Sequence, residues 1–430
     1  MFKLQENNTT VKTEIIAGLT TFFTMVYIVI VNPIILSEAG VPFEQVFMAT
    51  IIAAVIGTLW MALFANYPIA IAPGMGLNAY FTFSVVGGGV DYRTAFAAVF
   101  VAGILFLILS LTPLRRLIIE AIPDNLKFGI SAGIGLLIAF IGLRSAGIIV
   151  DHPDNLVALG DLHSPVVLLT LFGLLVAVIL MTLKVHGAIF FGMVITTIVG
   201  ILTGQLQFNE GFFALPDVPE LMINNPVTAF ADVISHSLYA VVFSFLLVTI
   251  FDTTGTLIGV AEQAGLMKGK TLPRANRALL SDSIATTIGS MFGTSPTTAY
   301  IESSSGVAAG GRTGLTSLTV AVLFIIASFF GPAVSAVSNV AAITSPALII
   351  VGSLMMGHIA KIHWGQIDEA FPAFLIIISI PLTSSISTGI ALGFISLPIL
   401  KIITGKWREI HPIVYVFGLL FIIQLAFLPH

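Results

Sequence analysis

Residues 70–89 read AIAPGMGLNAYFTFSVVGGG, and residues 294–311 read TSPTTAYIESSSGVAAGG. Both stretches contain a proline, then Ala-Tyr, then a run of glycines, and both are rich in residues that interrupt helices. A helix that crosses a bilayer needs about 20 apolar residues. We therefore expect residues 70–86 and 294–309 to cross a membrane as half-helices joined to extended backbone, so that helix ends meet near the middle of the bilayer.

The composition of the whole chain indicates that lipid surrounds it. Of 430 residues, 57% are hydrophobic and 9% are charged, and the mean hydropathy is +1.07. A soluble domain carries about 25% charged residues, so this composition excludes a water-soluble fold. The first apolar stretch runs too far to be a cleavable signal peptide, and we interpret it as a retained membrane span.

The other apolar stretches are separated by short polar breaks and have lengths close to one bilayer crossing. They cover residues 15–37, 46–66, 94–113, 127–146, 164–184, 187–204, 236–262, 274–291, 313–333, 343–360, 368–384 and 386–402. With the two short segments, numbers 3 and 10 in order, the sequence predicts an all-α polytopic membrane protein with fourteen transmembrane segments. The C-terminal stretch 411–428 fits either a fifteenth crossing or a helix lying at the interface.

The distribution of basic residues predicts the orientation of these segments. With the N-terminus in the cytoplasm, all of the 17 lysines and arginines except Arg93 and Arg144 fall on the cytoplasmic side, as the positive-inside rule requires. The cytoplasmic set includes four residues of connecting loops, Arg115, Arg116, Lys268 and Lys270. Residues 205–235 contain acids but no Lys or Arg, which indicates an extracellular connection.

The chain contains an internal repeat. The first span ends in SEAG at residues 37–40, the 236–262 span ends in EQAG at residues 262–265, and one of the two short segments follows each of them. Seven crossings separate equivalent elements, so the two halves have opposite orientations in the membrane. A seven-plus-seven inverted repeat with paired interrupted segments is typical of secondary transporters, whose substrate site lies between those segments. Two re-entrant loops with purely structural roles are the alternative interpretation.

Three carboxylates, Asp252, Asp282 and Glu302, lie inside predicted spans, and no Lys or Arg lies well inside a span to pair with them. Such groups favour the protonated form in a low dielectric, which suits a neutral polar solute and proton exchange. Glu302 lies in the first turn of the second half-helix, so it could bind substrate, cap that helix, or do both. For Asp252 the alternative is a structural hydrogen bond, and for Asp282 a bond between helices is the favoured interpretation.

Asn78 in the first short segment carries an amide that can both donate and accept hydrogen bonds, as recognition of a heterocycle requires; the alternative is a helix cap. The sequence contains no cysteine, no P-loop and no zinc-ligand motif, and its net charge of −4 includes no basic patch. We therefore expect no metal, cofactor, nucleic acid or enzymatic activity.

Three long motifs carry a family resemblance: APGMGLNAYF at 72–81, FDTTGTLIGVAEQAG at 251–265 and TTAYIESSSGVAAGGRTG at 297–314. The opening stretch 13–36 and SPALIIVGSLM at 345–355 match as well. At these positions the chain resembles the AzgA-like branch of the nucleobase–cation symporter-2 family, which includes the bacterial guanine/hypoxanthine permeases. The resemblance covers nearly the whole chain.

This resemblance implies a core domain and a gate domain, with the base bound between them and the core sliding against the gate like an elevator. The implied parts are core residues 1–113 and 236–333, gate residues 114–205 and 334–430, and an extracellular connection over residues 206–235. The implied substrate-binding residues are Asn78, Ala79, Asp252, Thr253, Thr256, Tyr300, Glu302 and Ser303, of which Asp252 and Glu302 would also carry the proton.

One position departs from the family pattern: Thr249 stands one helical turn before Asp252, where the family often has an acid, so proton and sodium coupling both stay open. The sequence therefore predicts a plasma-membrane symporter of purine bases, with hypoxanthine and guanine favoured and a homodimer through the gate domain considered. An adenine or xanthine/uracil permease is the nearest alternative. An anion exchanger or channel of the same architecture would require Lys or Arg at the half-helix ends.

Overall fold

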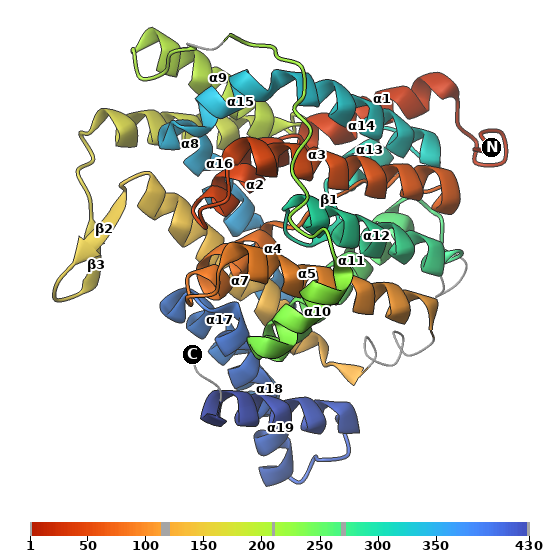
Figure 1. Cartoon of the computed structure of the whole chain (residues 1–430), viewed down its shortest axis with the longest axis vertical. Helices are drawn as coiled ribbons and strands as arrows, with labels where there is room; N and C mark the ends of the chain where they lie inside the picture. Colours follow the sequence, from red (N-terminus) through yellow and green to blue (C-terminus); the bar gives the residue numbers. More distant parts are fainter. Residues whose placement is uncertain (1, 113–120, 209–210, 268–271, 428–430) are drawn as a thin grey trace.

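The computed structural model describes residues 2–112, 121–208, 211–267 and 272–427, and it is mostly helical (Figure 1). The helices are α1 Val11–Met25, α2 Ile28–Ser37, α3 Phe43–Trp60, α4 Met75–Ala79, α5 Tyr92–Leu111, α7 Asp124–Ser145, α8 Pro165–Thr182, α9 Ala188–Leu202, α10 Pro226–Ser235, α11 Tyr239–Gln263, α12 Ala275–Phe292, α13 Ser303–Ala308, α14 Gly314–Ala327, α15 Gly331–Ser338, α16 Ala341–Met356, α17 Ile367–Thr383, α18 Ile386–Ile403 and α19 Pro412–Phe427. The strands are β1 Ile71–Pro73, β2 Ile149–His152, β3 Leu156–Leu159 and β4 Thr297–Ala299. Short π-helical turns η1 Met61–Ala65 and η2 Tyr80–Val86 and 3-10 turns η3 Ser328–Phe330 and η4 Gly357–Lys361 extend four of the helices.

Nine helical stretches within the described residues are long and apolar enough to cross a membrane. They are α1–α2, α3–η1, α5, α7, α8, α11, α14–α15, α16–η4 and α18. Each coincides with a predicted span, and the five other predicted crossings coincide with the shorter or more polar elements β1–η2, α9, α12, β4–α13 and α17. The exact count of fourteen crossings stays a prediction. Residues Arg115, Arg116, Lys268 and Lys270, and the domain boundary at 113–114, lie outside the described residues.

The two interrupted segments form the predicted half-strand and half-helix units. β1 pairs antiparallel with β4 in the register Ile71↔Ala299 and Pro73↔Thr297, although more than 200 residues separate them in sequence. The backbone N–H of Gly74 donates to the Pro296 carbonyl at 2.9 Å, which extends the ladder by one bond. Each strand then leads into a half-helix, α4 or α13, so the extended backbone is paired where hydrocarbon could not solvate it.

The helices pack into two bundles, which also contact each other. The first bundle contains α1–α5 and α11–α14, and the second bundle contains α7–α9 and α16–α18. Small residues allow the close approaches: a Cβ atom on Gly135 of α7 would lie 2.6 Å from the Met355 side chain of α16, the kind of contact that membrane helices use. Each bundle therefore combines elements from both halves of the sequence, as an inverted repeat predicts.

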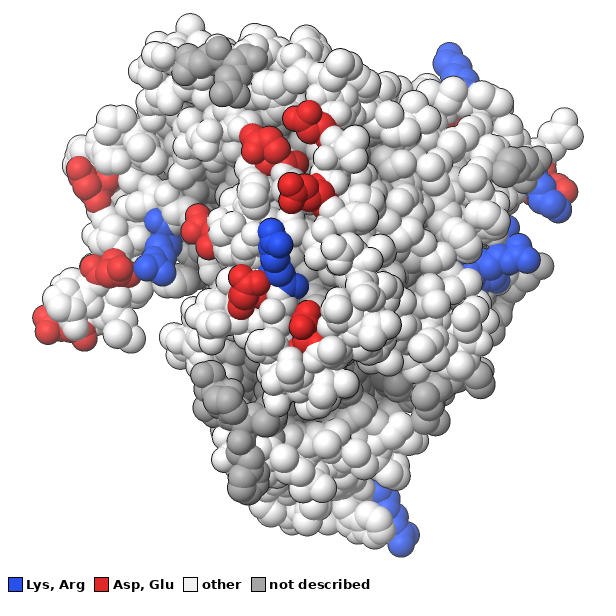
Figure 2. Space-filling model, in the orientation of Figure 1, with Lys and Arg blue, Asp and Glu red and all other residues white. Residues whose placement is uncertain are grey.

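Residues 211–225 run as an extended strap over the end of the first bundle, opposite the chain's N-terminus, and lead into α10 (Figure 1). The Met222 N–H donates to the Met291 carbonyl at 2.7 Å, and the Gln45 amide exchanges hydrogen bonds with the Glu220 backbone at 2.7 and 2.9 Å. In Figure 2, acidic side chains gather around this strap, whereas Lys and Arg lie mostly toward the right and lower margins. This asymmetry matches the charge pattern of the sequence.

Two peripheral elements complete the fold. β2 and β3 form a hairpin that projects from the molecule (Figure 1), a feature that the sequence analysis did not predict. The C-terminal stretch forms α19, whose Phe421 and Phe417 rings pack on Phe394 of α18 with centroids 5.7 and 5.9 Å apart. Gly418 lies against the backbone of Phe394 and the ring of Pro398, so α19 packs closely on α18.

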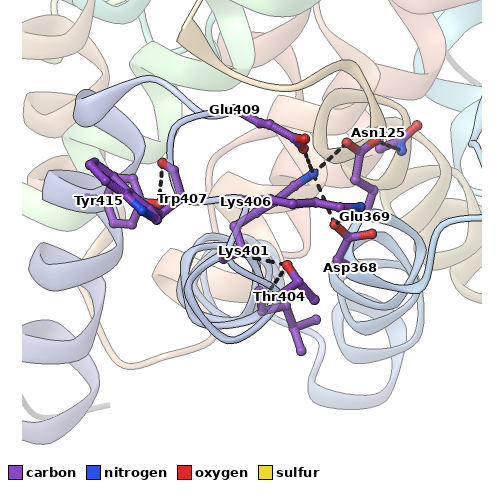
Figure 3. Close-up of polar contacts among 10 residues, drawn as sticks. Asn125, Asp368, Glu369, Lys401, Thr404, Lys406, Trp407, Glu409 and Tyr415 are labelled. Atoms are coloured by element: carbon purple, nitrogen blue, oxygen red, sulfur yellow. Dashed lines mark hydrogen bonds and ion pairs between the residues drawn. The ribbon is translucent and has the colours of Figure 1, made fainter.

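An ion-pair cluster around the buried Lys401 joins the ends of α7, α17 and α18 in the second bundle (Figure 3). Its other members are Asn125, Asp368, Glu369 and Glu409. The Lys401 side chain is 1% exposed, and its ammonium lies 3.2, 3.0 and 2.9 Å from carboxylates of Asp368, Glu369 and Glu409. The Asn125 amide donates to Glu369 at 2.8 Å. The cluster thus fixes the start of α7 relative to α18. The sequence predicts Lys401 at the cytoplasmic end of the span 386–402, and no local signal indicates its burial.

Replacement of Lys401 by Met should lower the free energy of unfolding by about 3 kcal/mol, because it leaves the nearly buried Asp368 without one of its two cations. Lys406→Met is the matched control: its ammonium also bonds Asp368, at 3.1 Å, but is 41% exposed, so its loss should cost less than about 1 kcal/mol. Thermal unfolding in detergent measures both. Equal melting temperatures for the two variants would contradict the structural role of Lys401.

Candidate functional site

Glu302 lies at the junction between β4 and the second half-helix, directly before α13. Its carboxylate accepts a hydrogen bond from the Tyr27 hydroxyl at 2.6 Å, and its carbonyl accepts one from the Thr24 hydroxyl at 3.4 Å. The side chain is half-buried. The position is that of a helix cap, as predicted, but no backbone N–H of α13 donates to the Glu302 carboxylate. The carboxylate is therefore left for other partners.

Asp252 lies on the part of α11 where burial ends. From Val242 to Ile250, α11 is buried at all positions but one, whereas Asp252 and three residues on the same face are exposed. We call this face, Asp252, Gly255, Gly259 and Glu262, the open face of α11. A carboxylate facing hydrocarbon would be very costly, so the open face borders water rather than lipid. It reaches the end of α11 that lies nearest the chain's N-terminus.

The open face and the second half-helix are linked. Thr253, the residue after Asp252 in α11, accepts a hydrogen bond from the Ala299 N–H of β4 at 3.2 Å, and Glu302 follows Ala299 by three residues. Ala299 pairs with Ile71 of β1. The two candidate carboxylates are therefore adjacent to the paired half-strands, where the sequence predicts a site.

Asp282 of α12 holds the half-strand from behind. It is fully buried and accepts hydrogen bonds from the hydroxyls of Thr253 and, at 2.5 Å, of Thr297. The Thr253 hydroxyl in turn accepts a bond from the Ala299 N–H at 3.2 Å. The prediction of a bond between helices for Asp282 is confirmed. Thr253, predicted to bind substrate, is buried in this network and points away from the open face.

Asn78 is also fully buried in this structure. Its amide nitrogen donates to Asn32 Oδ1 at 3.0 Å, and Asn32 itself donates to the hydroxyls of Thr50 and Thr294 at 2.7 and 2.9 Å. The Asn78 Oδ1 atom is buried without a hydrogen-bond partner among the described residues. An unpaired acceptor of this kind is costly unless a ligand or a second conformation satisfies it, so a substrate role for Asn78 stays a prediction.

The remaining predicted residues divide between support and access. Tyr300 donates to the Pro73 carbonyl at 2.6 Å, and the Ser303 hydroxyl accepts from the Ala70 N–H at 3.0 Å, so both brace the half-strands. Ala79 is fully buried at the end of α4. Thr256 is half-buried, one helical turn along α11 from Asp252.

Sequence reasoning missed two polar residues that the structure places beside the candidates. Tyr27 contacts Glu302, and Asn32 contacts Asn78. Both lie in the apolar run of the first span, where a single polar residue does not by itself indicate a site. The only available signal was that each interrupts the run of apolar residues. A third buried acid, Glu14, accepts bonds from the N–H groups of Arg312, Thr313 and Thr316 and caps α14.

One cation approaches α11 from the second bundle. The Lys127 ammonium lies 5.6 Å from the centre of the Phe251 ring and bonds Asp124 at 2.8 Å. It is thus paired and does not lie at a half-helix end, which is where anion recognition would require it. Among the described residues there is also no group of three His, Asp or Glu that could hold a metal ion.

Residues 12–392 match the sequence profile Xan_ur_permease, described as the permease family. The chain belongs to this nucleobase–cation symporter-2 family. The permease is 70% identical to the guanine/hypoxanthine permease PbuO of Bacillus subtilis strain 168, with 100% of both chains covered. It is 45% identical to the adenine permease AdeP of Escherichia coli strain K12, with 100% of this chain and 96% of AdeP covered.

Two solved structures share the permease's fold. The transmembrane domain of the cyanobacterial bicarbonate transporter BicA gives a TM-score of 0.63 at 18% identity, with 87% of this chain and 96% of that chain covered. SLC26A9 gives a TM-score of 0.67 at 12% identity, with 92% and 66% covered. These matches confirm the predicted class of seven-plus-seven inverted-repeat membrane proteins. At such identities they concern the fold alone.

Proposed function

We propose that this permease imports purine bases, with hypoxanthine and guanine favoured, by proton symport. The observation that carries the proposal is that Asp252, on the open face of α11, and Glu302, directly before α13, are both adjacent to the paired half-strands. Two acids without a cation at the half-helix ends suit a neutral solute that offers N–H donors. The 70% identical relative PbuO is a guanine/hypoxanthine permease, which supports the choice of these two bases.

The chemistry of the base fits one carboxylate well. Guanine presents its N1–H and exocyclic N–H₂ side by side, and hypoxanthine presents N1–H, so a single carboxylate can accept from either base. Adenine presents an acceptor at N1, and a site built for donors would reject it by leaving groups unpaired. An adenine permease is nevertheless the second candidate, because a relative with that activity is 45% identical over the whole chain.

Alternating access would proceed by an elevator-like movement. We assign the core domain to residues 1–113 and 236–333 and the gate domain to residues 114–205 and 334–430, and the packing of the described helices into two bundles supports this division. We place the N-terminus in the cytoplasm and residues 206–235 outside, since the basic residues then lie inside. The open face of α11 would then face the cytoplasm, and copies of the chain would pair through the gate domain in the cell membrane.

A contact between core and gate at the end opposite the open face supports an inward-facing state. The Ser84 hydroxyl, at the end of the first half-helix, donates to the Ser384 carbonyl at 2.9 Å and accepts from the Ile386 N–H at 3.1 Å. Ser84 belongs to the core, whereas Ser384 and Ile386 join α17 to α18 in the gate. Closure at this end with exposure at the other is the arrangement expected of an inward-facing transporter.

Proton coupling would use Asp252 and Glu302. Thr249, which stands where the family often has an acid, is buried and carries no carboxylate, so Asp252 has no acidic neighbour one helical turn before it in α11. Protonation of an ionised acid would remove one negative charge from the site and so lower the cost of moving the loaded core through the bilayer, where each extra charge is costly.

Proteoliposomes that contain the permease should accumulate labelled hypoxanthine when an inward proton gradient is imposed. Unlabelled guanine should compete, adenine and uracil should compete much less, and an uncoupler should abolish accumulation. Failure of well-folded protein to take up any of these bases would end the proposal. If accumulation survives the uncoupler but requires sodium, then sodium and not the proton is the coupling ion.

The carboxylates provide a test of the site. Glu302→Gln should reduce uptake at least ~100-fold, because the neutral amide cannot exchange a proton, while the melting temperature stays within about 2 °C of wild type. Asp282→Ala is the contrasting variant: it leaves two buried hydroxyls without their acceptor and should lower the free energy of unfolding by about 2 kcal/mol. Wild-type uptake by Glu302→Gln would remove Glu302 from the site.

Cross-linking tests alternating access. The chain has no cysteine, so a Ser84→Cys, Ser384→Cys double variant carries only the introduced pair. Oxidation or a short bifunctional reagent should join core to gate, stop uptake, and be reversed by reductant where a disulfide formed. Each single variant treated in the same way is the control. Full uptake by the cross-linked protein would contradict movement of the core against the gate.

A further inference from the structure

Tyr27 occupies the break in the first span. It is the second of the two residues between the end of α1 and the start of α2, its side chain is 1% exposed, and it makes no capping bond to α2. Within the described parts of the chain, its hydroxyl bonds a single group, the Glu302 carboxylate, which is 275 residues away in sequence and 2.6 Å away in space. Because this buried hydroxyl bonds a single carboxylate far away in sequence, we infer that it acts on that carboxylate and does not stabilise the first span.

The scaffold around Tyr27 fixes the distance between the two groups. α1 packs on α13 so closely that a Cβ atom on Gly306 would lie 2.6 Å from the Ala17 carbonyl. The Thr24 hydroxyl, one helical turn before the break, donates to the Thr21 carbonyl of its own helix at 2.7 Å and lies 3.4 Å from the Glu302 carbonyl. The end of α1 therefore packs against the Glu302 backbone and bonds its side chain through Tyr27, which restricts the rotamers of the carboxylate.

The geometry makes the two carboxylate oxygens different. Oε1 accepts from Tyr27, whereas Oε2 accepts no hydrogen bond from another residue in the part of the chain that the structure describes. A tyrosine hydroxyl keeps its proton at neutral pH and can donate whether the acid is charged or neutral. An acid already bonded at Oε1 takes its proton on Oε2, since Oε1 then serves as the carbonyl oxygen and keeps its bond to Tyr27.

We propose that Tyr27 is a positioning residue for Glu302: it holds Oε1 and presents Oε2 alone to the base and to the proton. This inference rests on the proposed role of Glu302 in base transport. It assigns to the first span a part in substrate recognition that none of the predicted site residues carries. Tyr27 itself need not touch the base.

The test is Tyr27→Phe, which removes the hydroxyl and keeps the buried ring. Equilibrium binding of labelled hypoxanthine to the purified permease should weaken about tenfold or more, the usual effect of losing a hydrogen bond to a charged group. Tyr67→Phe is the matched control, because the Tyr67 hydroxyl bonds the Pro273 carbonyl away from the site. Its affinity for hypoxanthine should equal that of wild type.

A second comparison separates positioning from stability. In a Glu302→Asp background the carboxylate is one methylene shorter and out of reach of Tyr27, so Tyr27→Phe should change the remaining affinity less than about twofold. Equal, additive losses in both backgrounds would overturn the proposal, and so would a lowered melting temperature with unchanged affinity. Failure of the proposed function has a different signature: wild-type protein that does not bind hypoxanthine, or Glu302→Gln that transports it.

Discussion

The pairing of β1 with β4 is the constraint on which the rest of this structure depends. Extended backbone in the middle of a bilayer has no water to bond, and each unpaired N–H or C=O costs several kcal/mol. The two half-strands solve this problem for each other through a short antiparallel ladder, Ile71↔Ala299 to Pro73↔Thr297. Neither crossing is viable alone. The inverted repeat is therefore a physical requirement as well as a symmetry, because it supplies the second strand.

The ladder also determines where polar chemistry can exist. Side chains next to the strands bond the remaining backbone groups: Ser303 accepts from Ala70, Thr253 from Ala299, and Tyr300 donates to Pro73. Asp282 accepts hydrogen bonds from the hydroxyls of Thr253 and Thr297 and so holds both in place. With these groups satisfied, Asp252 and Glu302 are left at the borders of the ladder with capacity for a solute. A polar scaffold that is otherwise closed gives specificity to the few acceptors that remain.

The sequence predicted the two half-crossings and the spans because each depends on residues that are close together in the chain. Proline, glycine runs and short apolar length indicated both half-crossings, and charge in loops indicated the spans. It could not predict that Tyr27 contacts Glu302 or that Asn32 contacts Asn78, since both pairs join segments far apart in the chain. The burial of Lys401 was hidden for the same reason: its three carboxylate partners come from α17 and a loop. The family resemblance assigned both Thr253 and Asp252 to the substrate site. Only the three-dimensional structure shows that Thr253 is buried and supports β4, whereas Asp252 lies on the open face.

The central claim is that a purine base occupies the open face of α11 beside the ladder. Gly255 allows a direct test, because a Cβ atom there meets no heavy atom within 4 Å and the chain has no native cysteine. Gly357 in η4 is equally open and serves as the control. In purified Gly255→Cys permease, saturating hypoxanthine should slow alkylation by a water-soluble maleimide at least ~5-fold, as expected for a site that excludes the reagent when occupied, and should leave Gly357→Cys unaffected. Alkylation of Gly255→Cys at one rate with and without bound hypoxanthine would contradict the account.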